Sequence, residues 1–484
     1  MGSHWRSSWP PRAASCTPRP RCWRGLDDRL ALLTAGPHNL PERQQTLHNT
    51  LDWSYALLRT EEQRLFARVA VFDGGWDLEA AEAACAPGLG AGVRGGLEAL
   101  ADHSLVEATD DGTTGPRFRM LETVREYAAA RLAESTEGED LRQRHAHYSL
   151  ALAEQADPAL IGPEQVAWQQ RLERELPNLR VALHTLLDGG DGSAALRLGA
   201  ALDRFWSRRS HITEGRAWLD EALALGVTAG PERAKALVVA GYLAMATGGF
   251  GRAEGLLADA LSLYRDPGDD RGVAWALSTQ GELARWREDY AHERACREQA
   301  LALYRRAGDR WGEAMTLYTL AGLTFFQGDV TQAEPLLRES RDLFVALGDR
   351  WGIAATLMFQ AGLAVRQGAY ATAGQIGREA LPLCRELDTW MTASCLKVLA
   401  WALAGTGQVE RAVRLFAAAE MLYARTGKIV LEAEQRTTEE VFGPIRVQLG
   451  AAAFAAARDA GRALSVDEAI EEALRIVPTL DGAA

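Results

Sequence analysis

Apolar residues recur at helical spacing along most of the chain. Leu26, Leu30 and Leu33 form one short apolar face, and Leu47, Leu51, Tyr55 and Leu58 form a longer one. Spacings of three and four residues place such side chains on one side of an α-helix. The pattern therefore predicts helices from residue 26 onward.

A second group of elements follows residue 59. Thr60 and Gln63 have the form of a capping box, so a helix is expected to begin at Thr60. Helices are also predicted over 78–85, 93–102 and 121–133. Between the last two, the segments Ser104–Ala108 and Arg117–Met120 flank the polar turn 110–115 and predict a small β-hairpin. Three helices followed by a hairpin are typical of a winged-helix domain.

The rest of the chain repeats itself at an interval of 40 residues, shown by 312 − 272 and 352 − 312. A weaker copy covers residues 194–225, and the interval falls to 39 at the last copy. Four phased columns carry the repeat: Gly272, Gly312 and Gly352; Tyr264, Tyr304, Phe344, Cys384 and Tyr423; Phe250, Tyr290, Val330, Tyr370 and Val409; Ala253, Glu293, Ala333, Ala373 and Ala412. Fixed periods of this length indicate stacked helical hairpins, which bury a core that one hairpin cannot bury alone.

These patterns predict an all-α fold, in which a winged-helix-like domain is followed by a tetratricopeptide-type α-solenoid. After residue 428 the repeat fades into further helices, and Ser465 with Glu468 predicts a capping box for the last one. We expect this tail to cover the open end of the stack.

Charge argues against a nucleic-acid surface. The net charge is −12, and only three lysines occur. Between Arg43 and Ser135 there are 9 Arg against 15 Asp and Glu, so this region carries 9 − 15 = −6. A helix that reads the major groove is usually basic. We therefore expect this chain alone not to bind DNA, and we expect the winged-helix region to be a connector between modules.

The sequence offers no catalytic constellation and no cofactor or metal site. The cysteines are dispersed, without a C-x-x-C pair, which suits a reducing cytoplasm: Cys16, Cys22, Cys85, Cys296, Cys384 and Cys395. Gly427-Lys428 lacks the earlier glycine of a phosphate loop, so no ATP or ADP binding is expected. Residues 90–95 match G-x-G-x-x-G, but they lie between two predicted helices, where an interhelical loop is the ordinary explanation. We expect no enzyme activity and no membrane-spanning segment.

The binding surface is expected on the first helix of each helical hairpin. Taking the column of Ala253 as the small position of the second helix sets the register. Counting back places these residues in the groove: Tyr242, Met245, Trp275, Arg285, Tyr318, Phe325, Met358, Lys397 and Trp401. Aromatic side chains with Arg and Lys suit an amphipathic peptide or an aromatic inducer. The competing interpretation is that these aromatic side chains simply belong to the core.

The chain resembles the C-terminal half of large actinobacterial-type regulators of the STAND ATPase class, known as LuxR-family or AfsR-like transcriptional regulators. The matching strings stand in order at residues 26–30, 43–47, 51–55, 71–75, 117–128 and 178–180, and in the Gly-Asp-Arg-Trp-Gly segments of the repeats. In that family an ATPase module precedes the winged helix, and the repeats sense a partner or inducer. The resemblance therefore implies a regulatory, ligand-sensing role.

This chain departs from the family pattern in two respects. It lacks the phosphate loop of the ATPase module, and no helix-turn-helix domain follows Leu474. The expected segments are a disordered or misassigned start (1–25), a remnant of the end of the ATPase module (26–42), a winged-helix-like domain (43–135), a helical linker (136–192), a tetratricopeptide-repeat solenoid (193–428) and C-terminal capping helices (429–484).

Three hypotheses for function follow. The leading one is a cytoplasmic sensor module of a truncated STAND-type transcriptional regulator, whose groove binds a protein, a peptide or a small inducer. The alternative is a stand-alone scaffold or adaptor unrelated to transcription. The third is a nucleotide-dependent switch that works with a separately encoded ATPase part. Self-association is a further partner option under each hypothesis.

Overall fold

The structure is a computed structural model that describes residues 47–90, 92–110, 115–265, 268–327, 329–426 and 432–475. The predictions for segments 1–25 and 26–42, including the helix at Leu26, lie outside the described residues. The chain divides into two compact units, Met1–Leu141 and Arg142–Ala484, called here the amino-terminal and carboxy-terminal units.

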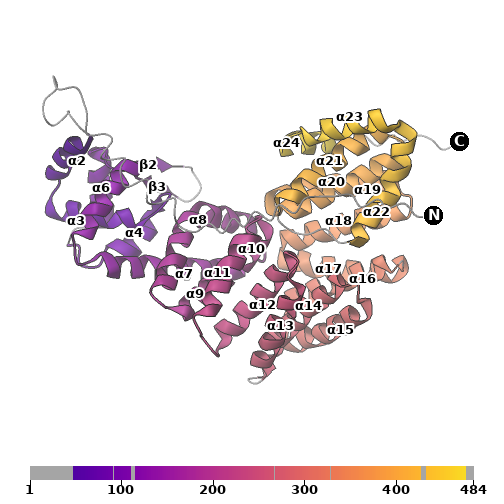
Figure 1. Cartoon of the computed structure of the whole chain (residues 1–484), viewed down its shortest axis with the longest axis horizontal. Coiled ribbons are helices and arrows are strands. Elements are labelled where there is room, and N and C mark those ends of the chain that lie inside the picture. Colours follow the sequence, from indigo (N-terminus) through magenta and orange to yellow (C-terminus); the bar gives the residue numbers. More distant parts are fainter. Residues whose placement is uncertain are drawn as a thin grey trace, which may run out of the picture. The chain divides into compact units, whose positions relative to one another are not determined.

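The amino-terminal unit contains short helices and a small antiparallel sheet (Figure 1). Its elements are α2 (Leu47–Ala56), α3 (Thr60–Arg68), the 3-10 helix η3 (Val69–Val71), β1 (Trp76–Asp77), α4 (Leu78–Cys85), α5 (Val93–Asp102), β2 (Glu107–Asp110), β3 (Pro116–Arg119) and α6 (Glu122–Ala133). The strand order is β1-β3-β2, and Phe118 of β3 lies opposite both Trp76 and Ala108. The winged-helix prediction is confirmed in its order of elements.

Two local predictions in this unit need correction. Arg59 is the residue that caps α3, so the capping box forms one position earlier than expected: the Arg59 amide donates to Glu62 Oε2 at 2.8 Å. Gln63 instead donates to the Tyr55 carbonyl at 2.9 Å. The first strand of the hairpin begins at Glu107 and not at Ser104, because Ser104 has a φ of +58° and turns the chain out of α5.

All secondary-structure elements described in the carboxy-terminal unit are helices. Its helices are α7 (Gly138–Ala159, beginning in the first unit), α8 (Gln165–Asp188), α9 (Gly192–Ala201), α10 (Asp203–Arg208), α11 (Ile212–Ala224), α12 (Pro231–Ala246), α13 (Phe250–Arg265), α14 (Asp270–Trp286), α15 (Tyr290–Ala307), α16 (Arg310–Phe326), α17 (Val330–Leu347), α18 (Arg350–Arg366), α19 (Tyr370–Leu387), α20 (Thr389–Gly405), α21 (Val409–Arg425), α22 (Glu432–Leu449), α23 (Ala451–Arg462) and α24 (Val466–Leu474).

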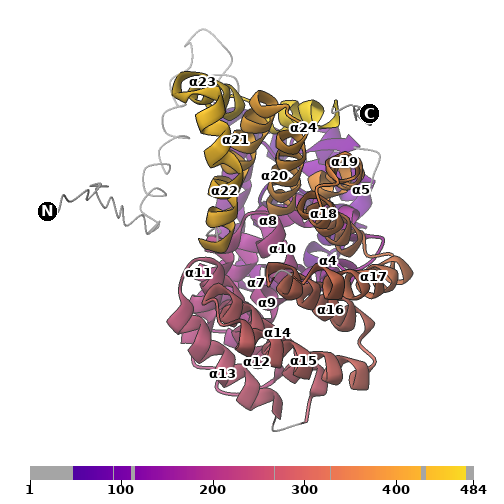
Figure 2. The same ribbon diagram turned by 90° about the vertical axis from the view of Figure 1, so that its right-hand side faces the viewer.

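These helices pair into stacked helical hairpins, which confirms the predicted α-solenoid (Figures 1 and 2). The pairs are α9 with α11, α12 with α13, α14 with α15, α16 with α17, α18 with α19, and α20 with α21. The column that contains Phe250 and Tyr290 marks the first residue of each second helix. The all-α fold class is therefore shown, with the sequence register intact.

Aromatic rings of the preceding helix pack directly against the repeated glycines. A Cβ added to Gly272, Gly312 or Gly352 would lie 2.2–2.3 Å from the ring of Tyr264, Tyr304 or Phe344 respectively. No larger side chain fits there without moving the ring. This contact links each helical hairpin to the next and accounts for two of the four phased columns.

The Gly-Asp turns end one hairpin and begin the next. Gly308 and Gly348 have φ values of +69° and +64° and cap α15 and α17 in the left-handed conformation. The following Asp309 and Asp349 accept hydrogen bonds from the Gly312 and Gly352 amides at 2.9 and 2.7 Å. They therefore satisfy amides in the first turns of α16 and α18.

The tail packs on the last helical hairpin. Helix α23 contacts α21, and α24 contacts α19, α20 and α21 (Figure 2). The predicted capping box of α24 is present, because Ser465 Oγ accepts from the Glu468 amide and Glu468 Oε2 accepts from the Ser465 amide. Phe442, Ile445 and Ile470 of the tail join the core of this end.

Candidate interaction surface

The first helices of five helical hairpins form a continuous face, called here the inner face. It consists of α12, α14, α16, α18 and α20, each of which contacts the next first helix along the stack. All nine residues predicted for the groove lie on these helices. The predicted register therefore selects the expected helices.

The nine residues differ in burial. Tyr242, Trp275, Arg285, Tyr318, Phe325 and Trp401 are half-buried and reach the surface in part. By contrast, Met245 is 0% exposed, and Met358 and Lys397 are each 7% exposed. These three belong to the core in this structure because their helix faces pack against neighbouring helices, which corrects their assignment to the groove.

Aromatic side chains form a connected stripe on α16 and α18. The ring centroid of Phe359 lies 5.9 Å from that of Tyr318 and 5.1 Å from that of Phe325, both with edge-to-face geometry. The guanidinium of Arg366 lies 4.9 Å from the Phe325 ring centroid. Burial raises the pKa of Tyr318 to about 12, so its hydroxyl stays protonated. The sequence analysis missed Phe359, which lies on α18 one residue after the predicted Met358.

Two further cationic side chains approach the inner face. Arg285 Nη2 donates to Glu282 Oε1 at 3.1 Å, and both side chains are one-quarter exposed. The Lys397 ammonium lies 5.4 and 5.2 Å from the ring centroids of Trp401 and Tyr423. Such cation–π contacts stabilise a positive charge against aromatic faces. The partly exposed Arg285 therefore lies on the inner face with the aromatic side chains, whereas the Lys397 ammonium is held in the core beneath Trp401.

One helical hairpin replaces the apolar pair of its neighbours with charges. Where the neighbouring helices α13 and α17 have alanine followed by leucine four residues later, helix α15 has Glu293 and Arg297, which are 0% and 3% exposed and lie 3.4 Å apart. Arg297 also donates to the Ser278 carbonyl at 3.1 Å. Burial raises the pKa of Glu293 and lowers that of Arg297. Glu293, the exception in its column, is thus matched by a second exception four residues later.

Tryptophans at equivalent repeat positions link consecutive hairpins, and this role was not foreseen. Trp311 Nε1 donates to Asp349 Oδ2 at 2.8 Å, and Trp351 Nε1 donates to Asp388 Oδ2 at 3.2 Å. Each aspartate also caps the first helix of its own hairpin. The repeated Gly-Asp-Arg-Trp-Gly segment could have revealed these tryptophan–aspartate hydrogen bonds, because its tryptophan stands in the first turn of a helix.

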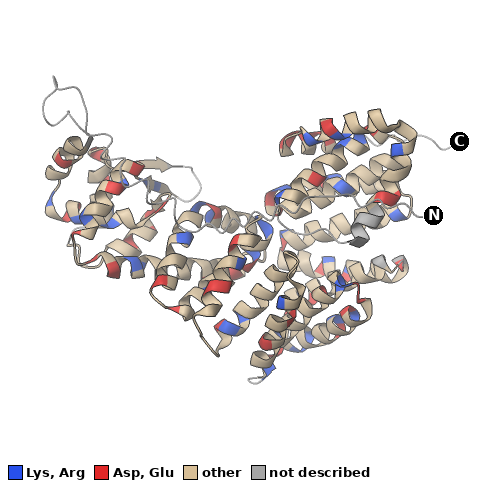
Figure 3. Cartoon of the chain, viewed as in Figure 1, with Lys and Arg blue, Asp and Glu red and all other residues tan. Residues whose placement is uncertain are grey.

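The winged-helix unit was the other candidate surface. The outward side chains of α5 include Arg94, Glu98 and Asp102, so acidic groups outnumber the arginine. Figure 3 shows both signs of charge interspersed on the helices of this unit. This distribution suits a protein contact better than a phosphate backbone.

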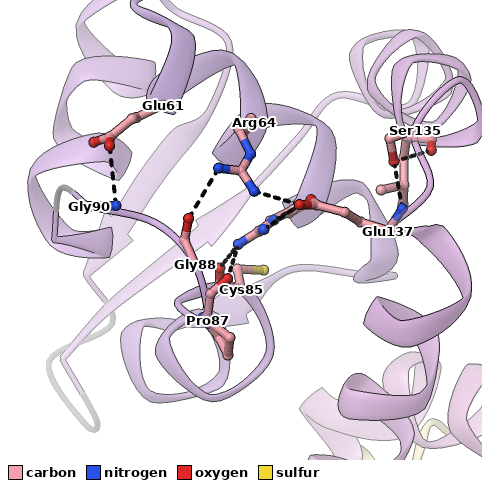
Figure 4. Close-up of polar contacts among 10 residues, drawn as sticks. Glu61, Arg64, Cys85, Pro87, Gly88, Gly90, Ser135 and Glu137 are labelled. Carbon is pink, nitrogen blue, oxygen red and sulfur yellow. Dashed lines mark hydrogen bonds and ion pairs between the residues drawn. The ribbon is translucent and has the colours of Figure 1, made fainter.

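A buried arginine cluster fixes the end of this unit (Figure 4). Arg68, with a side chain 3% exposed, donates to the carbonyls of Cys85 and Pro87 at 2.5 and 2.7 Å and to Glu137 at 2.9 Å. Arg64 donates to the Gly88 carbonyl at 3.0 Å and also pairs with Glu137. Both arginines hold the pKa of Glu137 at about 2. Glu137 directly precedes α7, so the cluster ties the start of α7 to α3.

Other motifs have structural explanations. Gly90 lies between α4 and α5, Gly92 directly precedes α5, and Gly95 belongs to the first turn of α5. The Gly90 amide donates to Glu61 Oε1 at 3.2 Å (Figure 4). Within the described ranges, no three His, Cys, Asp or Glu side chains are grouped in a way that would hold a metal ion. Among the helices that the structure describes, none has the length and apolar character needed to cross a bilayer.

Comparison with known proteins locates one domain. Residues 58–133 match the family described as winged helix-turn-helix domain. The chain is 37% identical over 272 residues to putative HTH-type transcriptional regulators of Mycobacterium tuberculosis and Mycobacterium bovis, which covers 53% of this chain. The chain spans only 30% of the length of these relatives.

Two solved structures show weaker similarity. One is a Signal Transduction ATPase with Numerous Domains (STAND) protein with a tetratricopeptide repeat sensor from Pyrococcus horikoshii, with a TM-score of 0.44, 13% identity, and coverage of 86% of this chain and 67% of that one. The other is the APC/C hetero-tetramer Cut9-Hcn1, with a TM-score of 0.35, 14% identity, and coverage of 62% and 59%. We draw no conclusion from similarities of this size.

The order of elements and the family match agree. The chain carries a winged helix-turn-helix domain and a helical solenoid of the tetratricopeptide type, and it is homologous to putative HTH-type transcriptional regulators.

Proposed function

We propose that this chain is the sensor and protein-interaction module of a STAND-type transcriptional regulator of the LuxR-family or AfsR-like kind. It acts in the cytoplasm without catalysis, and its inner face binds a peptide segment of a protein partner. The observation that carries this proposal is the half-buried aromatic stripe of Tyr318, Phe325 and Phe359 beside the cationic Arg366.

The chemistry of the stripe favours a peptide that carries both apolar and acidic groups. Half-buried aromatic rings offer apolar area that is already ordered, so little conformational entropy is lost on binding. Arg366 supplies a cation beside the Phe325 ring, and Arg285, which pairs with Glu282, lies on the neighbouring helix α14. Homology to putative transcriptional regulators supports a regulatory role for such binding.

Peptide selection tests this proposal. The purified full chain is used to select binders from a random-peptide library, and their Kd values are measured by fluorescence anisotropy. Phe325→Ala and Trp401→Ala should weaken binding about tenfold or more, as expected for interface aromatic residues. Val345→Ala is the matched control, because Val345 is 56% exposed on α17, the second helix of the hairpin that holds Phe325.

The control variant should bind within about twofold of the wild type, a difference too small for a lost interface contact. Selected peptides that bind Phe325→Ala and Trp401→Ala as tightly as the wild type would contradict an inner-face site. A peptide whose affinity falls only with Val345→Ala would place the surface on the second helices instead.

A further inference from the structure

Helix α10 lies against the first turns of two repeat hairpins within the carboxy-terminal unit. The guanidinium of Arg204 is 4.6 Å from the Trp311 ring centroid, and that of Arg208 is 4.9 Å from the Trp351 ring centroid. The two arginines are one helical turn apart on α10, and the two tryptophans occupy equivalent positions in consecutive hairpins. One short helix therefore contacts two consecutive rungs of the repeat.

Each arginine is also held by the segment around α7. Arg204 Nη1 donates to Asp157 Oδ1 at 2.8 Å, and Arg208 Nη1 donates to the Leu160 carbonyl at 3.1 Å. Arg208 is only 6% exposed. Burial lowers its pKa to about 10, while the carboxylates of Asp349 and Asp388 oppose that shift. The aspartates that accept the tryptophan N–H groups thus also stabilise the charge of Arg208.

Helix α8 makes a third contact with the same place. Gln165 Oε1 accepts a hydrogen bond from the Trp351 backbone amide at 2.9 Å, although the two residues are 186 positions apart. That amide lies in the first turn of α18, where no carbonyl of the helix itself is available. Helix α8 also contacts α19. Helices α8 and α10, near the start of this unit, therefore contact the α18–α19 hairpin directly.

The packing of α8 in this region also leaves buried polar atoms unpaired, which lowers the stability of the packed state. Gln165 and Gln169 are one turn apart on α8 and are both 0% exposed. Gln165 Nε2 and both polar side-chain atoms of Gln169 are buried without a hydrogen-bond partner among the described residues. Buried polar groups without partners oppose the state that buries them, because water would satisfy them on exposure. The arginine–tryptophan contacts and the Gln165–Trp351 hydrogen bond favour this packing, and the unpaired polar atoms Gln165 Nε2, Gln169 Nε2 and Gln169 Oε1 oppose it.

We propose that Arg204, Arg208, Gln165, Trp311 and Trp351 form a latch that holds α8 and α10 against hairpins α16–α17 and α18–α19. The carboxy-terminal unit opens at this latch when its partner binds. The link to a partner rests on the proposed function, whereas the opening itself does not.

Hydrogen exchange followed by mass spectrometry on the full chain tests the latch without any ligand. The Arg204→Gln/Arg208→Gln variant should speed exchange in the peptide 350–358 about tenfold, because local opening exposes these amides. Exchange in α12–α13 should stay within about twofold of wild type. Gln169→Leu should act in the opposite direction and slow exchange in 350–358, since it removes the buried polar atoms.

The matched control is Arg252→Gln, which removes another arginine–aspartate pair between helices. Arg252 Nη2 lies 2.6 Å from Asp220 Oδ1, on exposed surface away from the latch residues. This variant should leave exchange in 350–358 unchanged. Equal exchange in all variants would overturn the latch. Faster exchange throughout the unit in the double variant, together with no effect of Gln169→Leu, would also overturn it.

Hydrogen exchange in the presence of a peptide selected as above tests whether partner binding opens the latch. Binding of this peptide to the wild type should speed exchange in 350–358, as the double variant does. A peptide that binds the inner face and leaves this exchange unchanged would overturn opening on binding while the proposed function stands. If no selected peptide depends on the inner face, the proposed function fails, and the variants still decide whether the latch exists.

Discussion

His145 shows how a single buried residue sets a response to pH. Its side chain is 0% exposed in the core of the carboxy-terminal unit. Burial lowers its pKa from 6.5 to about 4, and a hydrogen bond to Asn178 only partly opposes this shift. The folded state therefore favours the neutral imidazole, whereas the unfolded chain binds a proton more readily.

The sign of the pH effect follows from these two values. The contribution of His145 is complete above pH 6.5 and is lost as the pH falls from 6.5 toward about 4. A shift of this size corresponds to about 3 kcal/mol. His145→Gln should reduce the loss of unfolding free energy between pH 6.5 and 4.5, measured by urea denaturation. His147→Gln, an exposed neighbour, should keep the wild-type slope, and a slope unchanged by His145→Gln would show that other groups cause it.

Glu137 presents the opposite case in the amino-terminal unit. Its carboxylate accepts hydrogen bonds from Arg64 and Arg68, and Arg68 is almost fully buried. Removing the carboxylate charge leaves the Arg68 guanidinium buried with carbonyl acceptors only. A buried charge that loses its partner is strongly destabilising.

We expect Glu137→Gln to destabilise the amino-terminal unit by about 2 kcal/mol, less than for a fully buried pair because Glu137 is partly exposed. Faster hydrogen exchange of α3 and α6 in the full chain would measure this change. Because the pKa of Glu137 is lowered to about 2, its contribution persists down to pH 4.5 and disappears only as the pH falls toward 2. The exposed pair of Arg119 and Glu107 is the control: Glu107→Gln should change stability by less than about 0.5 kcal/mol.

At the scale of the element, the repeated glycines decide how helical hairpins stack. Gly312 stands in the first turn of α16, where a Cβ would lie 2.3 Å from the Tyr304 ring. Gly362 lies in the interior of α18, where a Cβ would meet no atom within 4 Å. Both are helical glycines, and alanine is intrinsically the better helix former at both. Packing and propensity therefore act in opposite directions at Gly312 and not at Gly362.

The two substitutions should consequently change stability with opposite signs. Gly312→Ala should lower the unfolding free energy by about 2 kcal/mol, because the Tyr304 ring must leave its position. Gly362→Ala should raise it by about 0.5–1 kcal/mol. Chemical denaturation of the full chain, followed by circular dichroism, compares them. A stabilising Gly312→Ala would mean that the ring moves freely and that the glycine column has no packing role.

The helical elements were predictable because their signals are local. Helices α4 and α5 have the predicted bounds, α24 begins after the predicted capping residue Ser465, and the column that contains Phe250 marks the start of each second helix. The misplaced capping box of α3 has an equally local cause. Thr60 and Glu62 are both suitable capping residues, and only the extended backbone at Arg59 decides between the two registers.

The predicted groove was less accurate for a different reason. Helical phase identifies the side of a helix but not how far its neighbours extend over it. Met245 and Tyr242 are three residues apart on α12, yet the first is fully buried and the second is half-buried. Strand β1 was missed because two residues carry no periodicity, and it exists only through pairing with β3.

For the molecule as a whole, the contacts of α8 and α10 with the later repeats are the main feature that sequence could not reveal. Arg204 and Arg208 have the spacing of any exposed pair on a helix. Their tryptophan partners lie more than 100 residues away and are recognisable only as members of a repeat. Superhelical stacking brings these segments together, and no local pattern encodes its pitch.

Net charge leads to the last prediction, which concerns DNA. The whole chain carries −12, and residues 43–135 carry −6 from 9 arginines and 15 acidic residues. Duplex binding gains most of its non-specific free energy from the release of counterions by clustered lysines and arginines. The outward face of α5, the helix at the position of a recognition helix, has Glu98 and Asp102 beside Arg94. These carboxylates would lie against phosphates and repel them.

We therefore expect a Kd above about 100 μM for any duplex at 0.15 M salt, which is weaker binding than that of ordinary non-specific DNA-binding domains. Fluorescence anisotropy with random and genomic duplexes measures this affinity. The Glu98→Lys/Asp102→Lys variant reverses the sign of the α5 surface and should bind detectably at low salt, with an affinity that falls steeply as salt rises. Sequence-specific binding by the wild type at 0.15 M salt would show that α5 reads DNA despite its carboxylates. The winged-helix domain would then be a DNA-binding module, and the interpretation of this domain as a connector would be wrong.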